Sequence, residues 1–154
     1  MTLDRYDRQI LEILQQDGRI SNQDLADKIG LSASPCLRRV RALENSGTIT
    51  GYRALCDAKK LGLSLMVLLH IVMDRHTPDR FANFEAKVSE LPEVMECLLI
   101  TGQTADYQLK VVVEDMDAYQ ILLLNKITRI EGVSGVHSSF VMRKVVDKTA
   151  LPVR

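Results

Sequence analysis

The sequence predicts an α+β protein in which an N-terminal helix-turn-helix domain, winged-helix-like, precedes a ferredoxin-like βαββαβ domain. Three observations predict this fold class. Apolar residues recur at helical spacing through the first fifty residues, a glycine-containing turn separates two of those segments, and strand-like and helix-like segments alternate after residue 65. The expected boundaries are residues 1–55 for the first domain, 56–65 for a linker and 66–154 for the second domain.

The composition indicates a soluble chain with enough apolar residues for one or two cores. Of the 154 residues, 46% are hydrophobic, and 20 basic side chains balance 20 acidic ones. No segment reaches the roughly 20 apolar residues of a membrane span, and the first five residues lack the apolar core of a signal peptide. We therefore expect a cytoplasmic protein with no membrane partner, in which any surface for nucleic acid is local.

Three short helices are expected in the first domain. An apolar stripe from Tyr6 to Leu14 predicts the first helix, which ends at Asp17-Gly18. Ser21 is a good N-cap for the second helix because Asp24 follows three residues later, and Gly30 closes that helix.

The third helix follows after a tight turn. Ser32 is its expected N-cap, and Pro35 suits the first turn because its missing N–H is not needed there. Asn45-Ser46-Gly47 is a typical helix end. Two helices joined by so short a turn define a helix-turn-helix.

The second domain is expected to have the element order βαββαβ. Strand character is predicted for residues 66–73, 94–101, 107–113 and 136–146, and helical character for residues 77–91 and 116–130. This order is typical of four antiparallel strands with two helices on one face.

One face of such a sheet has no helices. The strands are nevertheless apolar in most positions, as in Leu68, Leu69, Ile71, Leu98, Ile100, Val111 and Val113. This pattern favours burial of the open face by another copy, so that we expect a homodimer at least.

The third helix carries the residues best suited to nucleic acid. Its first turn offers hydroxyl groups and free backbone N–H groups, and arginines follow at once. The candidates for DNA contacts are Ser32, Ser34, Cys36, Arg38, Arg39 and Arg41. Arginine binds guanine O6 and N7 or clamps a phosphate, and the sequence does not separate these two roles.

Three arginines within four residues are also common on solvated surface helices. The local charge favours DNA: residues 1–55 hold eight basic and seven acidic side chains, and four of the basic ones lie between Arg38 and Arg53 against the single acid Glu44. The positive charge is therefore concentrated on the third helix and just after it. Modest affinity for each subunit again favours a dimer that binds two half-sites.

The motifs of the first domain resemble those of the Lrp/AsnC family of feast/famine regulators. The resemblance lies in Asp7-Arg-Gln-Ile-Leu, Leu25-Ala26, Gly30-Leu31-Ser32, Arg38-Arg39-Val40 and Gly47-Thr48-Ile49. It covers the whole chain, because residues 102–107 are similar to that family's loop between the central strands. The resemblance implies a prokaryotic transcription regulator that dimerises through its sheets, assembles further into octamers or similar discs and binds amino acids between dimers.

The same resemblance implies an effector pocket that includes Gly102, Thr104, Asp106 and Tyr107. The chemistry suits an amino acid, because a carboxylate such as Asp106 can hold its ammonium group and the N–H groups of a glycine-rich turn can hold its carboxylate. Further candidates are Thr101 on the loop and Val136, His137 and Ser138 on the last strand. Apolar neighbours favour leucine or methionine. Without the resemblance, residues 102–106 are more typical of an ordinary hairpin turn.

Other functions have weaker support. His70, His76 and His137 lack metal-binding spacing, and three cysteines without a CxxC motif favour neither a zinc site nor a disulfide framework. We expect no cofactor and no metal. An enzyme is not expected either, since no GxSxG, phosphate loop or dinucleotide fingerprint is present. An architectural protein that binds DNA without an effector is the alternative function.

Overall fold

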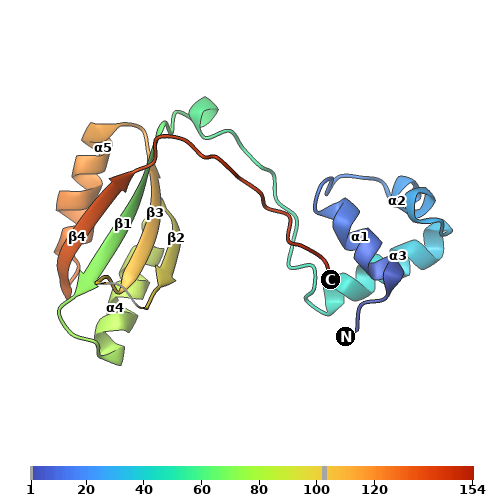
Figure 1. Ribbon diagram of the computed structural model, residues 1–154, viewed down its shortest axis with the longest axis horizontal. Helices are drawn as coiled ribbons and strands as arrows, with labels where there is room; N and C mark the ends of the chain where they lie inside the picture. Colours follow the sequence, from blue (N-terminus) through green and yellow to red (C-terminus); the bar gives the residue numbers. More distant parts are fainter. Residues whose placement is uncertain (1, 102–103) are drawn as a thin grey trace. The chain divides into compact units, whose positions relative to one another are not determined.

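The computed structural model describes residues 2–101 and 104–154 and divides into two compact units (Figure 1). The first unit comprises residues up to 55 together with residues 145–154, and the second comprises residues 56–144. The last ten residues therefore differ from the predicted boundary, which assigned them to the second domain. The predicted linker at 56–65 is part of the second unit.

The first unit contains three helices, as predicted: α1 (Arg5–Leu14), α2 (Asn22–Ile29) and α3 (Ala33–Asn45). Asp4 caps α1 in a reciprocal capping box with Asp7, and Ser21 caps α2 by accepting from the N–H of Asp24. Gly30 ends α2 with φ of 73°, a conformation that favours glycine. The core of this unit consists of Ile10, Leu11, Leu25, Ala26, Ile29, Cys36 and Leu43.

The second unit confirms the ferredoxin-like order. It contains β1 (Leu65–Met73), α4 (Pro78–Ser89), β2 (Val94–Leu99), β3 (Tyr107–Val113), α5 (Met116–Ile121) and β4 (Val133–Phe140). The helical segments η2 (Leu122–Lys126) and η3 (Ile127–Arg129) follow α5, and the short η1 (Lys59–Leu61) precedes β1. The strands pair antiparallel in the order β2-β3-β1-β4. The last strand ends at Phe140 instead of residue 146, because the chain then leaves the sheet as a tail.

Side chains alternate between the two faces of this sheet. Leu69 and Ile71 of β1 and Val111 and Val113 of β3 belong to the core of the unit, which also contains buried side chains of α4 and α5. Four of the seven apolar residues that predicted a second copy therefore lie on the covered face. The open face is mixed: Leu68 and Leu98 share it with His70, Gln108, Lys110 and His137, which are register neighbours on the four strands.

Within the described part of the chain, no helix is long and apolar enough to cross a membrane.

Candidate nucleic-acid interface and ligand pocket

Helix α3 exposes a polar stripe. Ser34, Arg38 and Arg41 are exposed and follow one another at helical spacing, so that they line one shallow hollow of about 400 Å³. Ser32 lies at the start of the helix, and its hydroxyl makes no capping bond to the described residues. Hydroxyl groups at a helix N-terminus followed by guanidinium groups are suited to phosphates and base edges.

The two arginines of this stripe are not neutralised by the protein. Among residues 2–101 and 104–154, no ion pair involves Arg38 or Arg41. Because arginine loses little hydration when it enters a polar interface and presents a rigid fork of donors, both side chains are free to bind an anionic partner.

Arg39 lies on another side of α3 and holds α1. Its Nη1 donates to Asp4 Oδ2 at 2.7 Å and to Asp7 Oδ1 at 2.8 Å, and its guanidinium lies 5.2 Å from the ring centroid of Tyr6. These hydrogen bonds, first to Asp4 and then to Asp7, raise the pKa of Arg39. In the structure the Arg39 side chain thus ties two helices together, a role that the predicted DNA contact did not include.

Cys36 is also not available to DNA. Its side chain has 0% exposure and lies in the core between the helices, and burial raises the pKa of its thiol. The sequence reasoning allowed a small residue facing either the groove or the neighbouring helix, and the structure has the second arrangement. A buried thiol with a raised pKa is also a poor redox switch.

The turn before α3 is fixed by bonds from α2. Asn22 Nδ2 donates to the carbonyl of Ala33 at 2.8 Å, and the N–H of Leu31 donates to the carbonyl of Ala26 at 3.0 Å. The first turn of α3 is therefore held in place while its outer stripe stays exposed, which is the arrangement that a helix entering a DNA groove requires.

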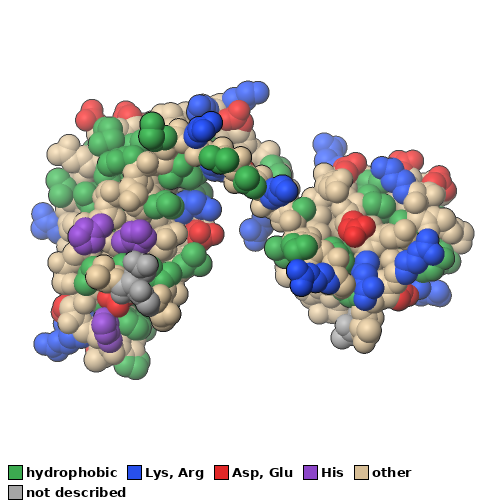
Figure 2. All heavy atoms as spheres, viewed as in Figure 1, with side chains coloured by type: hydrophobic (Ala, Val, Ile, Leu, Met, Phe, Trp, Pro, Cys, Tyr) green, Lys and Arg blue, Asp and Glu red, His purple; other side chains and the backbone are tan. Residues whose placement is uncertain are grey.

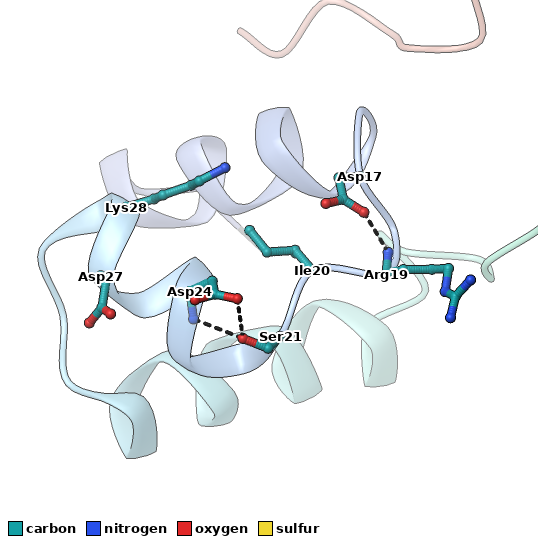
Figure 3. Close-up of a pocket in the computed structure, with 7 residues that line it drawn as sticks. All are labelled: Asp17, Arg19, Ile20, Ser21, Asp24, Asp27 and Lys28. Carbon is teal, nitrogen blue, oxygen red and sulfur yellow. Dashed lines mark hydrogen bonds between the residues drawn. The ribbon is translucent and has the colours of Figure 1, made fainter.

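A second hollow of the first unit, about 580 Å³, lies beside the start of α2 (Figure 3). Its polar groups already bond one another: Asp24 pairs with Ser21 in the helix cap, and Asp17 accepts from the N–H of Arg19. Three carboxylates, those of Asp17, Asp24 and Asp27, line it against the two cations Arg19 and Lys28, so that the net negative charge disfavours a phosphate there.

On the second unit, a hollow of about 590 Å³ opens on the uncovered face of the sheet, and we call it the loop hollow. It is lined by His70, Ile100, Thr101, Thr104, Ala105, Gln108 and His137. The histidine side chains gather on this face (Figure 2). The structure thus brings together Thr101, Thr104 and His137 from the predicted effector site, whereas the predicted Gly102 lies outside the described residues.

Asp106 does not offer a free carboxylate to a ligand. Its Oδ2 accepts from the N–H of Met73 at 2.7 Å, and its Oδ1 lies 2.8 Å from Nε2 of His76. Both oxygens thus fasten the start of β3 to the end of β1 and the segment after it. The structure favours a role for Asp106 in holding the loop instead of binding an ammonium group.

Three further predicted residues lie on the opposite face of the sheet. Tyr107 is 1% exposed, packs against Phe84 and donates to Glu85 Oε1 at 2.7 Å, and burial followed by this bond raises its pKa. Val136 packs against the helix-covered core, and Ser138 bonds Tyr119. Because strand residues alternate, these three cannot share one surface with His137.

His70 and Gln108 were missed by the sequence reasoning as members of the pocket. The two are direct cross-strand partners, and His70 Nε2 lies 3.1 Å from Gln108 Oε1; His137 is the partner of His70 on its other side. The sequence did contain one signal: side chains of a strand alternate between the two faces of a sheet, so that His70 lies on the face opposite to Leu69 and Ile71. The strand order was needed to place it beside His137.

Comparison with known proteins gives two family matches. The model of the Lrp/AsnC ligand binding domain matches residues 66–151, and that of a winged helix-turn-helix DNA-binding domain matches residues 3–50. The chain is 44% identical over 151 residues to the Bkd operon transcriptional regulator of Pseudomonas aeruginosa, covering 98% of each chain. It is 45% identical over 152 residues to the leucine-responsive regulatory protein of Escherichia coli, covering 99% of this chain and 92% of the relative.

Solved structures show the same similarity. A transcriptional regulator from Neisseria meningitidis in complex with L-Met is 36% identical, with a TM-score of 0.94 and coverage of 98% of this chain and 97% of that one. E. coli AsnC is 29% identical, with a TM-score of 0.89 and coverage of 97% and 98%.

Proposed function

Since the chain belongs to the Lrp/AsnC family and is a DNA-binding transcriptional regulator with a ligand-binding domain, we propose that it reads a specific DNA sequence through α3 and responds to an amino acid. The prediction that it is not an enzyme is confirmed by this family of regulators. The main support for sequence-specific DNA binding is the exposed stripe of Ser34, Arg38 and Arg41. Its two guanidinium groups have no protein partner among the described residues. We propose a cytoplasmic location in a prokaryote, where a regulator that binds DNA has access to its promoters.

Fewer residues are proposed to contact DNA than the sequence suggested. Ser32 and Ser34 would bind phosphates at the start of α3, Arg38 would reach a base edge, and Arg41 would reach a base edge or a phosphate. Arg39 would act by keeping α3 against α1, at the distances given above. A single exposed stripe supplies few contacts, so we propose that two copies bind two half-sites.

The second copy is proposed to lie on the open face of the sheet. Leu68 and Leu98 on this face are apolar, and Leu98 is 45% exposed. The polar residues between them make this face less apolar than the sequence suggested, as expected for a dimer surface that also borders a polar pocket. Assembly beyond the dimer, to an octamer, is part of the same proposal.

The loop hollow is the proposed amino-acid site. The hydroxyls of Thr101 and Thr104 and a ring N–H of His137 can donate to the carboxylate, and the carbonyl oxygen of Gln108 can accept from the ammonium group. Ile100 and Ala105 offer apolar contact for an aliphatic side chain. The Neisseria regulator holds L-Met and one relative is named leucine-responsive, which supports methionine or leucine as the effector.

A thermal-shift measurement with L-methionine and L-leucine tests this site. A ligand present at about 100 times its Kd stabilises the folded state by about 2.7 kcal/mol, so the wild-type melting temperature should rise by several degrees. Thr104→Val keeps the side-chain shape but removes the hydroxyl, and His137→Ala removes the ring. We expect each variant to lose at least half of the shift.

Thr128→Val is the matched control, because the Thr128 hydroxyl bonds the carbonyl of Leu124 on η2 and lies outside the loop hollow. It should keep the full shift. Equal shifts in wild type, Thr104→Val and His137→Ala would place the amino acid elsewhere.

A further inference from the structure

The last residues of the chain pack on the DNA-binding unit although they follow the ligand-binding domain in sequence. Gln15, the C-cap residue of α1, bonds the backbone of Leu151 in both directions: its Nε2 donates to the Leu151 carbonyl at 3.1 Å, and its Oε1 accepts from the Leu151 N–H at 2.6 Å. Val153 packs against the core of the same unit. Residues 145–154 therefore belong structurally to the helix-turn-helix.

These residues form one wall of a groove of about 460 Å³, which we call the tail groove. Its other walls come from residues 48–52 and from α1 with the segment before it, and its lining includes Leu3, Leu11, Leu14, Gln15 and Tyr52. The side chain of Leu151 is 75% exposed, so its backbone and not its side chain makes the specific contact. A glutamine that pairs with both the N–H and the carbonyl of one residue recognises an extended segment in the way a neighbouring strand would.

Both walls of the tail groove are bonded to α3. From α1, Asp4 and Asp7 accept from Arg39. From the other wall, the Tyr52 hydroxyl donates to Glu44 Oε1 of α3 at 2.9 Å, and burial together with this bond raises the pKa of Tyr52 to about 12. A displacement of the docked tail would thus reach the reading helix through two separate contacts.

The other end of the tail is continuous with the strand that carries His137. Just after this strand, the N–H of Val141 donates to the carbonyl of Met66 at 3.0 Å, and residues 145–154 begin after three further residues. The two units are therefore joined by two covalent connectors, one before β1 and one after β4.

We propose that the tail groove is the docking site for the C-terminal segment of this chain, and that the docked segment couples occupancy of the loop hollow to the position of α3. The coupling half rests on the proposed function, whereas the docking half does not. A second connector fastened at both ends limits how the reading helix moves when β4 changes its environment, which a single linker could not do.

Gln15→Ala tests the docking in the full-length protein, because it removes both bonds to Leu151. Gln16→Ala is the matched control: the neighbouring glutamine lies outside the tail groove. Hydrogen exchange measures the protection of the Leu151 amide. This amide should exchange at least about tenfold faster in Gln15→Ala than in wild type, and at the wild-type rate in Gln16→Ala. Equal protection of Leu151 in wild type and Gln15→Ala overturns the docking.

The coupling is tested by DNA affinity with and without saturating L-methionine. Wild type should change its Kd for DNA when L-methionine is added, and Gln15→Ala should lose most of that change while keeping the thermal shift with L-methionine. The same change in both proteins overturns the coupling. A wild-type protein that shows no thermal shift contradicts the proposed effector and with it the coupling, while hydrogen exchange still decides the docking.

Discussion

Arg38→Ala is expected to weaken binding to promoter DNA at least about tenfold without changing the melting temperature. Arg38 is exposed on the outer stripe of α3 and has no ion pair among the described residues, so its removal deprives the DNA of a donor and leaves the protein intact. A lost base contact costs about 1–3 kcal/mol, and a dimer loses it in both half-sites. Fluorescence anisotropy with a labelled duplex from the region upstream of the protein's own gene measures the effect.

Arg19→Ala provides the matched control for net charge. Arg19 lies before α2, beside the acidic hollow of Figure 3, so the same charge is removed away from the reading stripe. Its effect on Kd should be small and should fade with added salt. If both variants weakened binding equally, or if Arg38→Ala bound as wild type does, α3 would not be the reading helix.

Arg39→Ala is expected to show the opposite behaviour, a loss of stability that precedes any loss of DNA contacts. The substitution removes the only cation that pairs with Asp4 and Asp7 among the described ion pairs, and Asp7 is 7% exposed. A carboxylate left without its partner in so little solvent is costly. We expect the melting temperature of the DNA-binding unit to fall by roughly 5 °C, measured by calorimetry. Arg39→Lys should recover part of this loss.

The effect of Arg39→Ala should also depend on pH. The pKa of Asp4 is lowered in the folded state, first by the backbone hydrogen bond from Asp7 and also by Arg39. A lowered pKa contributes stability above the unfolded value of about 3.9, and this contribution is lost as the pH falls through the lowered folded value. Wild type and Arg39→Ala should therefore differ at pH 7 and converge below about pH 4. A difference that is constant across this range would contradict the pairing.

Local signals in the sequence were sufficient for the elements. The caps at Ser21 and Gly30 and the apolar stripe of α1 are short-range features, and the helices begin and end within a few residues of their predicted positions. The order βαββαβ follows from the alternation of strand and helix patterns, and the structure confirms it.

Contacts between distant residues account for what the sequence reasoning missed. The bonds between Gln15 and Leu151 join residues 136 positions apart, and nothing local in the last ten residues indicates where they dock. Arg38 and Arg39 differ in the side of α3 on which they lie. This difference shows which arginine pairs with protein carboxylates only when the position of α1 and its acidic N-terminus is known. Charge composition alone could not separate the two arginines.

The prediction of the pocket residues was incomplete for a related reason, because it needed the exact start of a strand. Asp106 and Tyr107 are adjacent in the loop motif, yet one fastens two strand ends and the other fills the helix-covered core. Strand alternation predicts that neighbours in sequence face opposite sides, but the start of β3 had to be known to the residue before that rule could be applied. The same rule, applied to the known register, brings His70 and His137 together.

Selection from a random-sequence duplex library tests the central claim most directly. A regulator that reads base edges through the α3 stripe of two copies should enrich a two-fold symmetric sequence, and Arg38→Ala should lose the base preference at one position in each half-site. An architectural protein would bind all duplexes alike. A wild-type selection that enriches no sequence, or an Arg38→Ala selection with the unchanged motif, would contradict the assignment of α3 as the sequence reader.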